Sequence, residues 1–209
     1  MPRPRMFDEA DVVDRARRTF AETGFAGTSL DDLLEATGLA RQSLYNAFGG
    51  KKELFMRAFL SDTSSAVDAV STVMRSAEDP IVRIRTKLVS TAVEHGSAAA
   101  SPSLFLRAAV ELSGSDPEVA ATVATAFDDI RADYTACIVD AQHAGEIDAG
   151  ADAEALGTYF CAVIEGMSTL GRAGVARATL LQMGLTSLTA VPITPLGHER
   201  LGTEDGAWT

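Results

Sequence analysis

The chain has 209 residues, 46% of them hydrophobic and 22% charged, a balance typical of a globular protein and not of a disordered one. Its formal net charge of −11 argues against indiscriminate binding to nucleic acid. The charge is unevenly distributed, because residues 1–52 hold 8 basic and 8 acidic side chains and the remaining residues hold 10 and 21. This asymmetry suggests two domains with two roles.

Nothing in the sequence suggests export or a membrane span. Cys137 and Cys161 lack the spacing of a metal or redox motif and lie on apolar faces, so we expect two reduced, inert thiols. The N-terminus has no apolar signal stretch, and the longest uncharged run, 178–197, contains polar residues and two prolines. We expect a cytoplasmic protein with no metal, no other cofactor and no membrane partner.

Apolar residues recur with a 3.6-residue period through most of the chain, and no segment alternates over the length of a strand. The sequence therefore predicts an all-α fold of about nine helices. The first four are predicted over residues 8–22, from Thr28 or Ser29 to Gly38, over 41–48 and over 51–74. Gly24 ends the first helix, and either Thr28 or Ser29 can cap the second.

The later helices are predicted from their caps and glycines. Asp79-Pro80 and Asp116-Pro117 each combine a capping residue with proline at the first helical position. The predicted ranges are 80–95, 103–112, 117–145, 152–173 and 176–191. We expect a helix-turn-helix domain over 1–50, a larger helical ligand-binding and dimerisation domain over 51–191, and a poorly ordered tail over 192–209.

Residues 28–48 contain the segment that is most informative about function. They predict a capped helix, a turn through Gly38 and a second short helix, with Leu39 between the two and Leu44 and Phe48 holding the second helix to the first. The outward face of that second helix carries hydrogen-bonding side chains and no carboxylate: Arg41, Gln42, Ser43, Tyr45 and Asn46. A helix that enters the major groove of DNA needs such a face.

The position of each side chain on the second helix predicts its role. The N-terminal half of a recognition helix points at the bases, so we expect Arg41, Gln42 and Ser43 to read sequence. Tyr45 and Asn46 are better placed for phosphate oxygens, which set register without specifying sequence.

Two other helix N-termini, at Thr28 with the adjacent Ser29 and at Lys51, present backbone N–H groups that favour a phosphate. In addition, residues 7–59 resemble the DNA-binding domain of TetR-family repressors, whose pattern is a glycine, a Thr-Ser/Thr pair, a turn glycine, Leu-Tyr-x-x-Phe and Lys. The matching positions are Gly24, Thr28, Ser29, Gly38, Leu44, Tyr45, Phe48 and Lys51. The resemblance implies that Tyr45 and Lys51 contact phosphates.

The sequence departs from this pattern at two positions of the recognition helix. Ala40 stands where Ser or Thr usually caps the helix, a loss of about 1 kcal/mol of capping. Ala47 replaces the usual His or Tyr and removes one expected backbone contact. Both departures leave the operator sequence open.

The second part of the chain resembles a TetR-family branch, more loosely. The similarity lies in Leu104–Leu112 and Asp116–Val119, where the corresponding helix often begins with cysteine. Here that position is Ser103, and Arg107 replaces a frequent Asn. Thiol-based sensing at this position is therefore not expected.

A palindromic operator is read by two recognition helices, so the resemblance implies a homodimer. We expect the interface on the last two predicted helices, at Leu156, Phe160, Val163, Met167, Leu181 and Leu185; the alternative is that this apolar stripe is the core of a monomer. An unknown small-molecule effector is expected near Phe105, Arg107, Glu111, Tyr134 and Cys137; the alternative for each is packing or a local ion pair.

The sequence disfavours two other classes of function. An enzyme would need a phosphate-binding glycine loop, a nucleophile elbow or an acid/base pair, and the sequence shows none of these. An interaction protein with a decayed DNA-binding face is disfavoured by the carboxylate-free face over 41–46. The sequence therefore predicts a DNA-binding transcriptional regulator that is not an enzyme, a repressor released from its operator double-stranded DNA by a small molecule.

Overall fold

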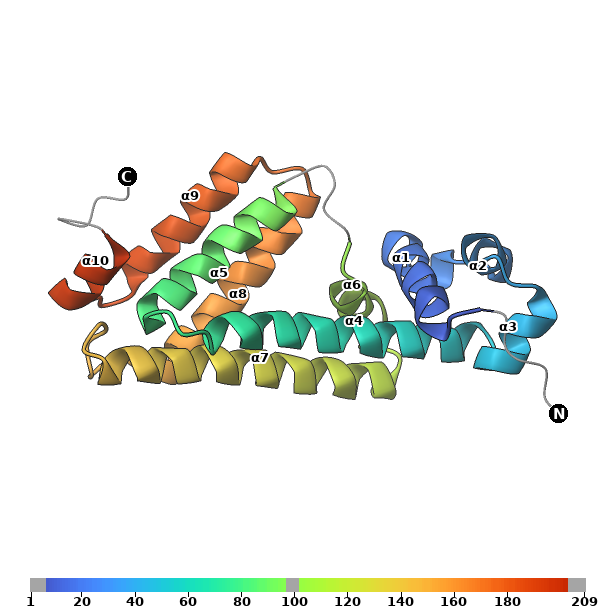
Figure 1. The fold of residues 1–209 in the computed structure, drawn as a ribbon, viewed down its shortest axis with the longest axis horizontal. Helices are drawn as coiled ribbons and strands as arrows, with labels where there is room; N and C mark the ends of the chain where they lie inside the picture. The colour runs from blue at the N-terminus through green and yellow to red at the C-terminus, as the bar shows by residue number, and fades with distance from the viewer. Residues whose placement is uncertain (1–6, 97–101, 203–209) are drawn as a thin grey trace. The chain divides into compact units, whose positions relative to one another are not determined.

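The computed structural model describes residues 7–96 and 102–202, and within them it contains ten α-helices and one short 3-10 helix (Figure 1). These are α1 (Glu9–Gly27), α2 (Leu30–Thr37), α3 (Arg41–Phe48), α4 (Lys51–Met74), α5 (Pro80–His95), α6 (Leu104–Leu112), α7 (Pro117–His143), α8 (Ala153–Arg172), α9 (Arg177–Ser187), η1 (Leu188–Ala190) and α10 (Pro195–Leu201). The prediction of an all-α fold is confirmed, with one helix more than expected. None of the described helices is both long enough and apolar enough to cross a membrane.

The chain separates into two compact units. Within the described residues, the first unit takes in 7–66 and 102–126, and the second takes in 67–96 and 127–202. Helices α4 and α7 therefore contribute residues to both units. This division differs from the predicted boundary after residue 50, because α6 packs with α1 in the first unit.

An aromatic core holds the first unit together. Phe20 of α1 and Phe55 and Phe59 of α4 are buried, with Phe20 edge-on to Phe55 at 5.2 Å between ring centroids and Phe55 stacked on Phe59 at 5.9 Å. Burying a large apolar side chain contributes roughly 1.5–3 kcal/mol. Leu33 of α2 and Leu44 of α3 add fully buried side chains, so the two short helices are fixed by packing as well as by their caps.

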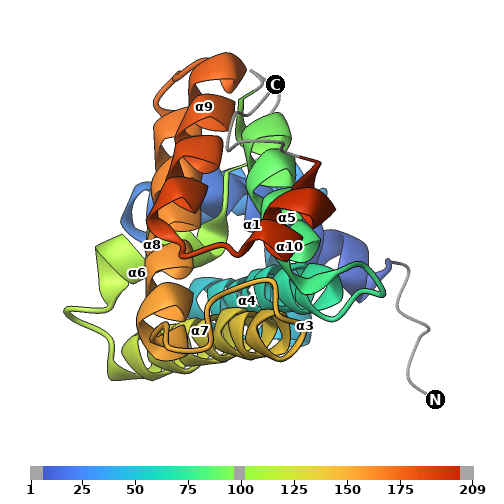
Figure 2. The same ribbon diagram turned by 90° about the vertical axis from the view of Figure 1, so that its left-hand side faces the viewer.

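In the second unit α5, α8 and α9 pack against one another (Figures 1 and 2). Glycine permits the closest approach, because a Cβ at Gly171 of α8 would lie 2.5 Å from the carbonyl oxygen of His95 on α5. The predicted apolar stripes of α5 and α8 are buried here. Their buried members include Ile81, Ile84, Leu88 and Ala92 on α5 and Phe160, Ile164 and Met167 on α8.

The sequence predicts that Asp79 caps the first turn of α5. In the structure a distant carboxylate caps it instead. Asp79 makes no capping hydrogen bond and pairs with Arg200 at 3.3 Å. Glu146, only 2% exposed, instead accepts a hydrogen bond from the Ile81 amide at 2.9 Å across 65 residues of chain. At the second Asp-Pro pair, Asp116 caps α7 as predicted. The Asp-Pro signal thus gives the start of α5 correctly but not its capping group.

Helix α10 lies within the region predicted to be a poorly ordered tail, 192–209. The Thr194 hydroxyl caps it by accepting a hydrogen bond from the Gly197 amide at 3.2 Å, and Pro195 occupies its first turn. Gly197 packs so closely against the Glu146 carbonyl that a Cβ would overlap it. The helix has 7 residues, too few to show an apolar period in the sequence. Residues 203–209 lie outside the described part.

Candidate DNA-binding site

Helix α2 begins with a reciprocal cap at Ser29. The Ser29 hydroxyl accepts a hydrogen bond from the Asp32 amide at 3.1 Å, and the Asp32 carboxylate accepts one from the Ser29 amide at 2.7 Å. The Ser29 N–H thereby lowers the pKa of Asp32. This capping box satisfies two amides that would otherwise lack partners. Gly38 ends the helix with a φ of 71°, a left-handed conformation that favours glycine. The predicted turn between α2 and α3 is present.

The hydroxyl and the amide of Thr28 both have a partner within the protein. The residue is 1% exposed, and its hydroxyl donates to the Gly24 carbonyl at 2.6 Å. Its amide donates to the same carbonyl at 3.2 Å. Of the two capping residues considered from the sequence, Ser29 caps α2, and Thr28 instead closes the end of α1.

Helix α3 separates an inner apolar face from an outer polar one. Leu44 and Phe48 are buried, as predicted, and Leu39 is half-buried. On the outer face Ser43 is half-buried, and the exposed residues are Arg41, Gln42, Tyr45 and Asn46. The Gln42 side-chain amide donates to the Asn46 side-chain oxygen at 2.9 Å, which orders two of the predicted DNA-contacting groups. Ala40 supplies no side-chain cap, as the sequence implied.

Arg41 is paired with a carboxylate that the sequence of α3 alone does not reveal. Its Nη2 lies 2.7 Å from Oδ1 of Asp31 in the first turn of α2, and the two side chains are 58% and 80% exposed. An ion pair so exposed contributes roughly 0–1 kcal/mol. Arg41 can therefore exchange Asp31 for a phosphate or a base edge at small cost.

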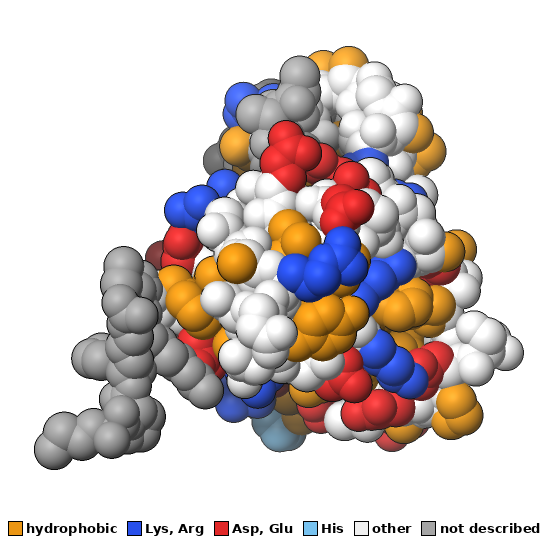
Figure 3. Space-filling model, turned by 90° about the vertical axis from the view of Figure 1, so that its right-hand side faces the viewer, with side chains coloured by type: hydrophobic (Ala, Val, Ile, Leu, Met, Phe, Trp, Pro, Cys, Tyr) orange, Lys and Arg blue, Asp and Glu red, His pale blue; other side chains and the backbone are white. Residues whose placement is uncertain are grey.

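Lys51 begins α4 and is held by an aromatic ring. Its Nζ lies 4.4 Å from the centroid of the Phe25 ring, a cation–π contact. Lys52 is paired with Asp116 at 3.0 Å, and this hydrogen bond raises the pKa of Lys52. On the face seen in Figure 3, basic side chains lie near the centre, next to hydrophobic side chains and with acidic ones above and below them.

Helix α6 holds the end of α1 through Glu111. Gly24 interrupts α1 with φ 81° and ψ 171°, and the Glu111 carboxylate accepts hydrogen bonds from the next two amides, Phe25 at 3.1 Å and Ala26 at 2.8 Å. Arg107 donates to the Ala21 carbonyl at 3.5 Å. A Cβ at position 24 would overlap the Glu111 carboxylate, so this approach requires glycine. The sequence does not predict this contact, because its partners are 85 or more residues apart.

Two family profiles match the chain. "Bacterial regulatory proteins, tetR family" matches residues 12–58, and "Tetracyclin repressor-like, C-terminal domain" matches residues 102–180. Together they cover the helix-turn-helix and most of the helices from α6 to α9. The chain belongs to the TetR family.

Relatives of this TetR-family chain are transcriptional regulators and not enzymes. It is 51% identical over 61 residues to the uncharacterized HTH-type transcriptional regulator YezE of Bacillus subtilis, a match that covers 29% of this chain and 31% of that protein. It is 26% identical over 193 residues to the HTH-type transcriptional repressor ComR of Escherichia coli, covering 91% of each. A cysteine mutant of the TetR-family regulator CifR, solved with 26-base-pair operator DNA, matches at 26% identity and a TM-score of 0.81, covering 91% of this chain and 100% of that one.

The five residues predicted to bind an effector in this TetR-family chain are divided between the two units. Phe105, Arg107 and Glu111 belong to the first unit, where Phe105 is buried and the other two contact α1. Tyr134 and Cys137 belong to the core of the second unit, each 1% exposed. Burial raises the pKa of Tyr134 well above its usual value and that of Cys137 to about 12. The alternative of packing roles fits these positions.

The cysteines and Ser103 have the environments of structural residues. Burial raises the pKa of Cys161 to about 11, which supports the expectation of an inert thiol. Ser103 caps α6 by accepting a hydrogen bond from the Leu106 amide at 3.2 Å, and its hydroxyl donates to Asp62 at 3.3 Å. Asp62 also pairs with Arg17 at 3.2 Å. The position at which the TetR-family branch often carries cysteine therefore joins a hydrogen-bond network in the first unit.

The residues predicted for the dimer interface divide into two groups. Phe160 and Met167 are fully buried within the single chain and have no surface to give to a partner. The others retain some exposure: Leu156 and Val163 on α8, and Leu181 and Leu185 on α9, where both leucines line a cavity beside α5. Leu170, a further apolar residue of the same stripe on α8, is 40% exposed. Because the apolar stripe of α8 is wide, its period alone could not separate the core side from the outer side.

Proposed function

We propose that this TetR-family chain is a repressor that binds a palindromic operator as a homodimer and is released when a small molecule binds its second unit. The observation that carries the proposal is the outer face of α3, which presents exposed hydrogen-bonding side chains and no carboxylate of its own. The proposed DNA contacts are Ser29, Arg41, Gln42, Ser43, Tyr45, Asn46 and Lys51.

The roles follow from position and exposure. Arg41 and Gln42, in the first turn of α3, are proposed to meet base edges, together with Ser43. Tyr45, 47% exposed, and Lys51, at the start of α4, are proposed to hold phosphates. The operator complex of CifR supports the same use of the fold here.

A dimer is proposed through the outer sides of α8 and α9. A recognition helix in each copy would meet successive turns of the operator, about 34 Å apart or more. Leu156, Val163 and Leu170 supply apolar surface on α8. Phe160 and Met167 are buried in the core of the single chain and therefore do not contribute to the proposed interface.

Ligand control is proposed to act through α4. This helix has its N-terminus at Lys51 in the first unit and its C-terminal residues in the second. A ligand that binds two arrangements of the second unit with different affinity would move α4 and change the separation of the two recognition helices in a dimer.

The proposal is tested by selecting bound sites from a random pool of double-stranded DNA with the full chain. Affinity for the recovered fragment is then measured by fluorescence anisotropy at several salt concentrations. We expect a palindromic site, two chains per site, and affinity that falls steeply with salt. Arg41→Ala and Tyr45→Ala should each weaken binding by about ten- to a hundredfold, whereas Arg131→Ala on α7 should not.

Unchanged binding in both the Arg41 and the Tyr45 variant would show that α3 is not the reading helix. Recovery of sites without twofold symmetry, bound by one chain, would contradict the dimer. A screen for small molecules that release the labelled fragment tests the remaining part of the proposal.

A further inference from the structure

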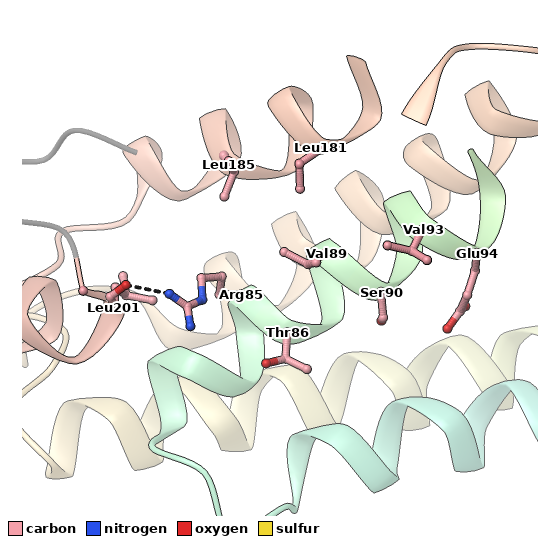
Figure 4. A pocket seen from close by; sticks show the side chains of 10 residues that line it. Arg85, Thr86, Val89, Ser90, Val93, Glu94, Leu181, Leu185 and Leu201 are labelled. Atoms are coloured by element: carbon pink, nitrogen blue, oxygen red, sulfur yellow. Dashed lines mark hydrogen bonds between the residues drawn. The ribbon is translucent and has the colours of Figure 1, made fainter. Parts of the chain in front are cut away.

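The second unit contains a cavity of about 680 Å³ between α5, α9 and α10 (Figure 4). Its walls combine aliphatic side chains with a few polar ones, the composition typical of small-molecule sites. The lining residues from α5 are Arg85, Thr86, Val89, Ser90, Val93 and Glu94, and Leu181, Leu185, Leu201 and Gly202 complete it. The volume falls within the roughly 300–1,000 Å³ of sites for drug-sized ligands.

Helix α5 presents two parallel rows to this cavity. Val89 and Val93 are four residues apart and therefore lie on one side of the helix, facing Leu181 and Leu185 of α9 across the space (Figure 4). The second row runs parallel to the first and is polar: Thr86 and Ser90 carry hydroxyls, and Glu94 follows them. The cavity thus has an aliphatic side that suits a hydrocarbon chain.

Arg85 supplies a cation at one end. Its Nη1 donates to the Leu201 carbonyl at 2.5 Å, which fixes the guanidinium at the α10 end of the cavity (Figure 4). A guanidinium has five N–H donors in a planar fork that matches a carboxylate. The contact with Leu201 uses one of these donors and leaves others for a bound anion.

Glu94 stands at the opposite end. At about 1.5 Å of rise per residue, α5 separates Arg85 from Glu94 by roughly 13 Å along its axis. A negative charge at the Glu94 end would be repelled, so a ligand with a carboxylate at each end is disfavoured. The arrangement selects for one anionic end and one uncharged end.

We propose that this cavity binds a medium-chain organic monocarboxylate, with the carboxylate at Arg85 and the hydrocarbon chain along the valine and leucine side chains. The inference rests on the proposed function, because it names the class of effector that the second unit would sense. The chemistry at the two ends also predicts an order of preference among ligands of equal length.

The first test uses three ten-carbon probes with the full chain in the absence of DNA, below the critical micelle concentration: decanoate, decanol and the dicarboxylate sebacate. Isothermal titration should give one site per chain for decanoate. Decanol lacks the anion, and sebacate places a second anion at Glu94. We expect each to bind about tenfold more weakly than decanoate.

Variants then assign the two ends. Arg85→Gln should weaken decanoate by about tenfold or more and leave decanol unchanged. Arg131→Gln, the same change at an arginine of α7 outside the cavity, should leave decanoate binding as it is in the parent chain. Glu94→Gln should bring sebacate close to decanoate, and Ser90→Phe should block all three probes by filling the space.

Equal affinity for decanoate and decanol, or decanoate binding that survives Arg85→Gln, would overturn the inference. So would a change in oligomeric state on Ser90→Phe, measured by sedimentation, because the cavity would then be covered by a second copy. If decanoate binds as expected but does not release the operator, the site stands and the proposed ligand control fails. If the chain binds no operator at all, the titration still decides the site.

Discussion

Around α1 to α3, several polar side chains of the first unit cap helices or pair with one another, whereas the second unit buries several polar atoms that have no partner. Ser29 and Asp32 cap α2 reciprocally, and Glu111 satisfies two amides at the end of α1. Among the described residues, the second unit has four buried side-chain atoms without a hydrogen-bond partner, and the first has one, on Ser113. The four belong to His95, Tyr134, Thr135 and Glu165.

The first unit is held in place by satisfied hydrogen bonds around α1 to α3. The folded state of the second unit could still be made more stable by removing its unpaired polar groups. A buried polar group without a partner costs roughly 1–3 kcal/mol. Removing a partner in the first unit should therefore destabilise it, and removing a lone polar group in the second unit should stabilise it. A reading surface benefits from the first property, because base contacts require fixed geometry.

The largest effect is expected at Glu111, where one carboxylate serves two amides. Glu111→Ala should lower the free energy of unfolding by about 2–3 kcal/mol, because the Phe25 and Ala26 amides lose their acceptor. Urea unfolding followed by circular dichroism measures this. Glu22→Ala, at an exposed position of α1, is the control and should change little. A loss as small as that of the control would mean that solvent replaces Glu111 and that the first unit does not depend on this contact.

The next effect has the opposite sign and concerns Tyr134. Tyr134→Phe should raise the free energy of unfolding by about 1 kcal/mol, because it removes a buried hydroxyl that has no partner. Tyr159→Phe is a matched control, since the Tyr159 hydroxyl donates to the Ser187 carbonyl at 3.2 Å, and its removal should cost about 1 kcal/mol. If both variants lose stability, Tyr134 has a partner in solution and the two units differ less in their buried polar groups.

The sequence predicts the helix-turn-helix in detail because its determinants are local. The cap at Ser29, the turn at Gly38 and the inner contact of Leu44 are each set by residues within a few positions of one another. The exposure of Arg41 follows from the 3.6-residue period of α3. Its pairing with Asp31 does not, because that contact depends on the angle between two helices.

The parts that the sequence could not predict are those made by distant residues. Glu146 caps α5 from 65 residues away, and Glu111 reaches α1 from 85 residues away. The cavity beside Arg85 requires α10, whose short length hides its period. Glu111 shows the difficulty, because in the sequence alone a carboxylate among apolar residues is equally suited to binding an effector and to capping a helix.

A smaller stabilisation is expected at the start of α3. Ala40→Ser should raise the free energy of unfolding by about 0.5–1 kcal/mol, because it supplies the side-chain cap that Ala40 lacks. Ala47→Ser, inside the same helix, should lower it slightly through helix propensity. Thermal unfolding of both variants checks the pair. No gain from Ala40→Ser would show that the start of α3 is already satisfied by its packing, which would extend the rigidity of the first unit beyond its caps.

The smallest effect depends on pH and concerns Glu165. Burial raises the pKa of Glu165, with Arg172 and Lys87 opposing the shift. A carboxyl group whose pKa is higher in the folded than in the unfolded state stabilises the fold at low pH, and this contribution is lost as pH rises through the folded value. Glu165→Gln should therefore be more stable than the parent chain near pH 7, and the difference should shrink towards about pH 4.

Urea unfolding at the two pH values measures the Glu165 effect, with Glu154→Gln, at an exposed position of the same helix, as the control. The effect should be modest because Glu165 is only half-buried as a residue, although one of its carboxylate oxygens is fully buried. A difference that stays constant between the two pH values would assign it to packing of the amide. A difference that grows towards neutral pH would show that the second unit carries a charged group whose burial costs stability, in contrast to the paired carboxylates around α1 and α2.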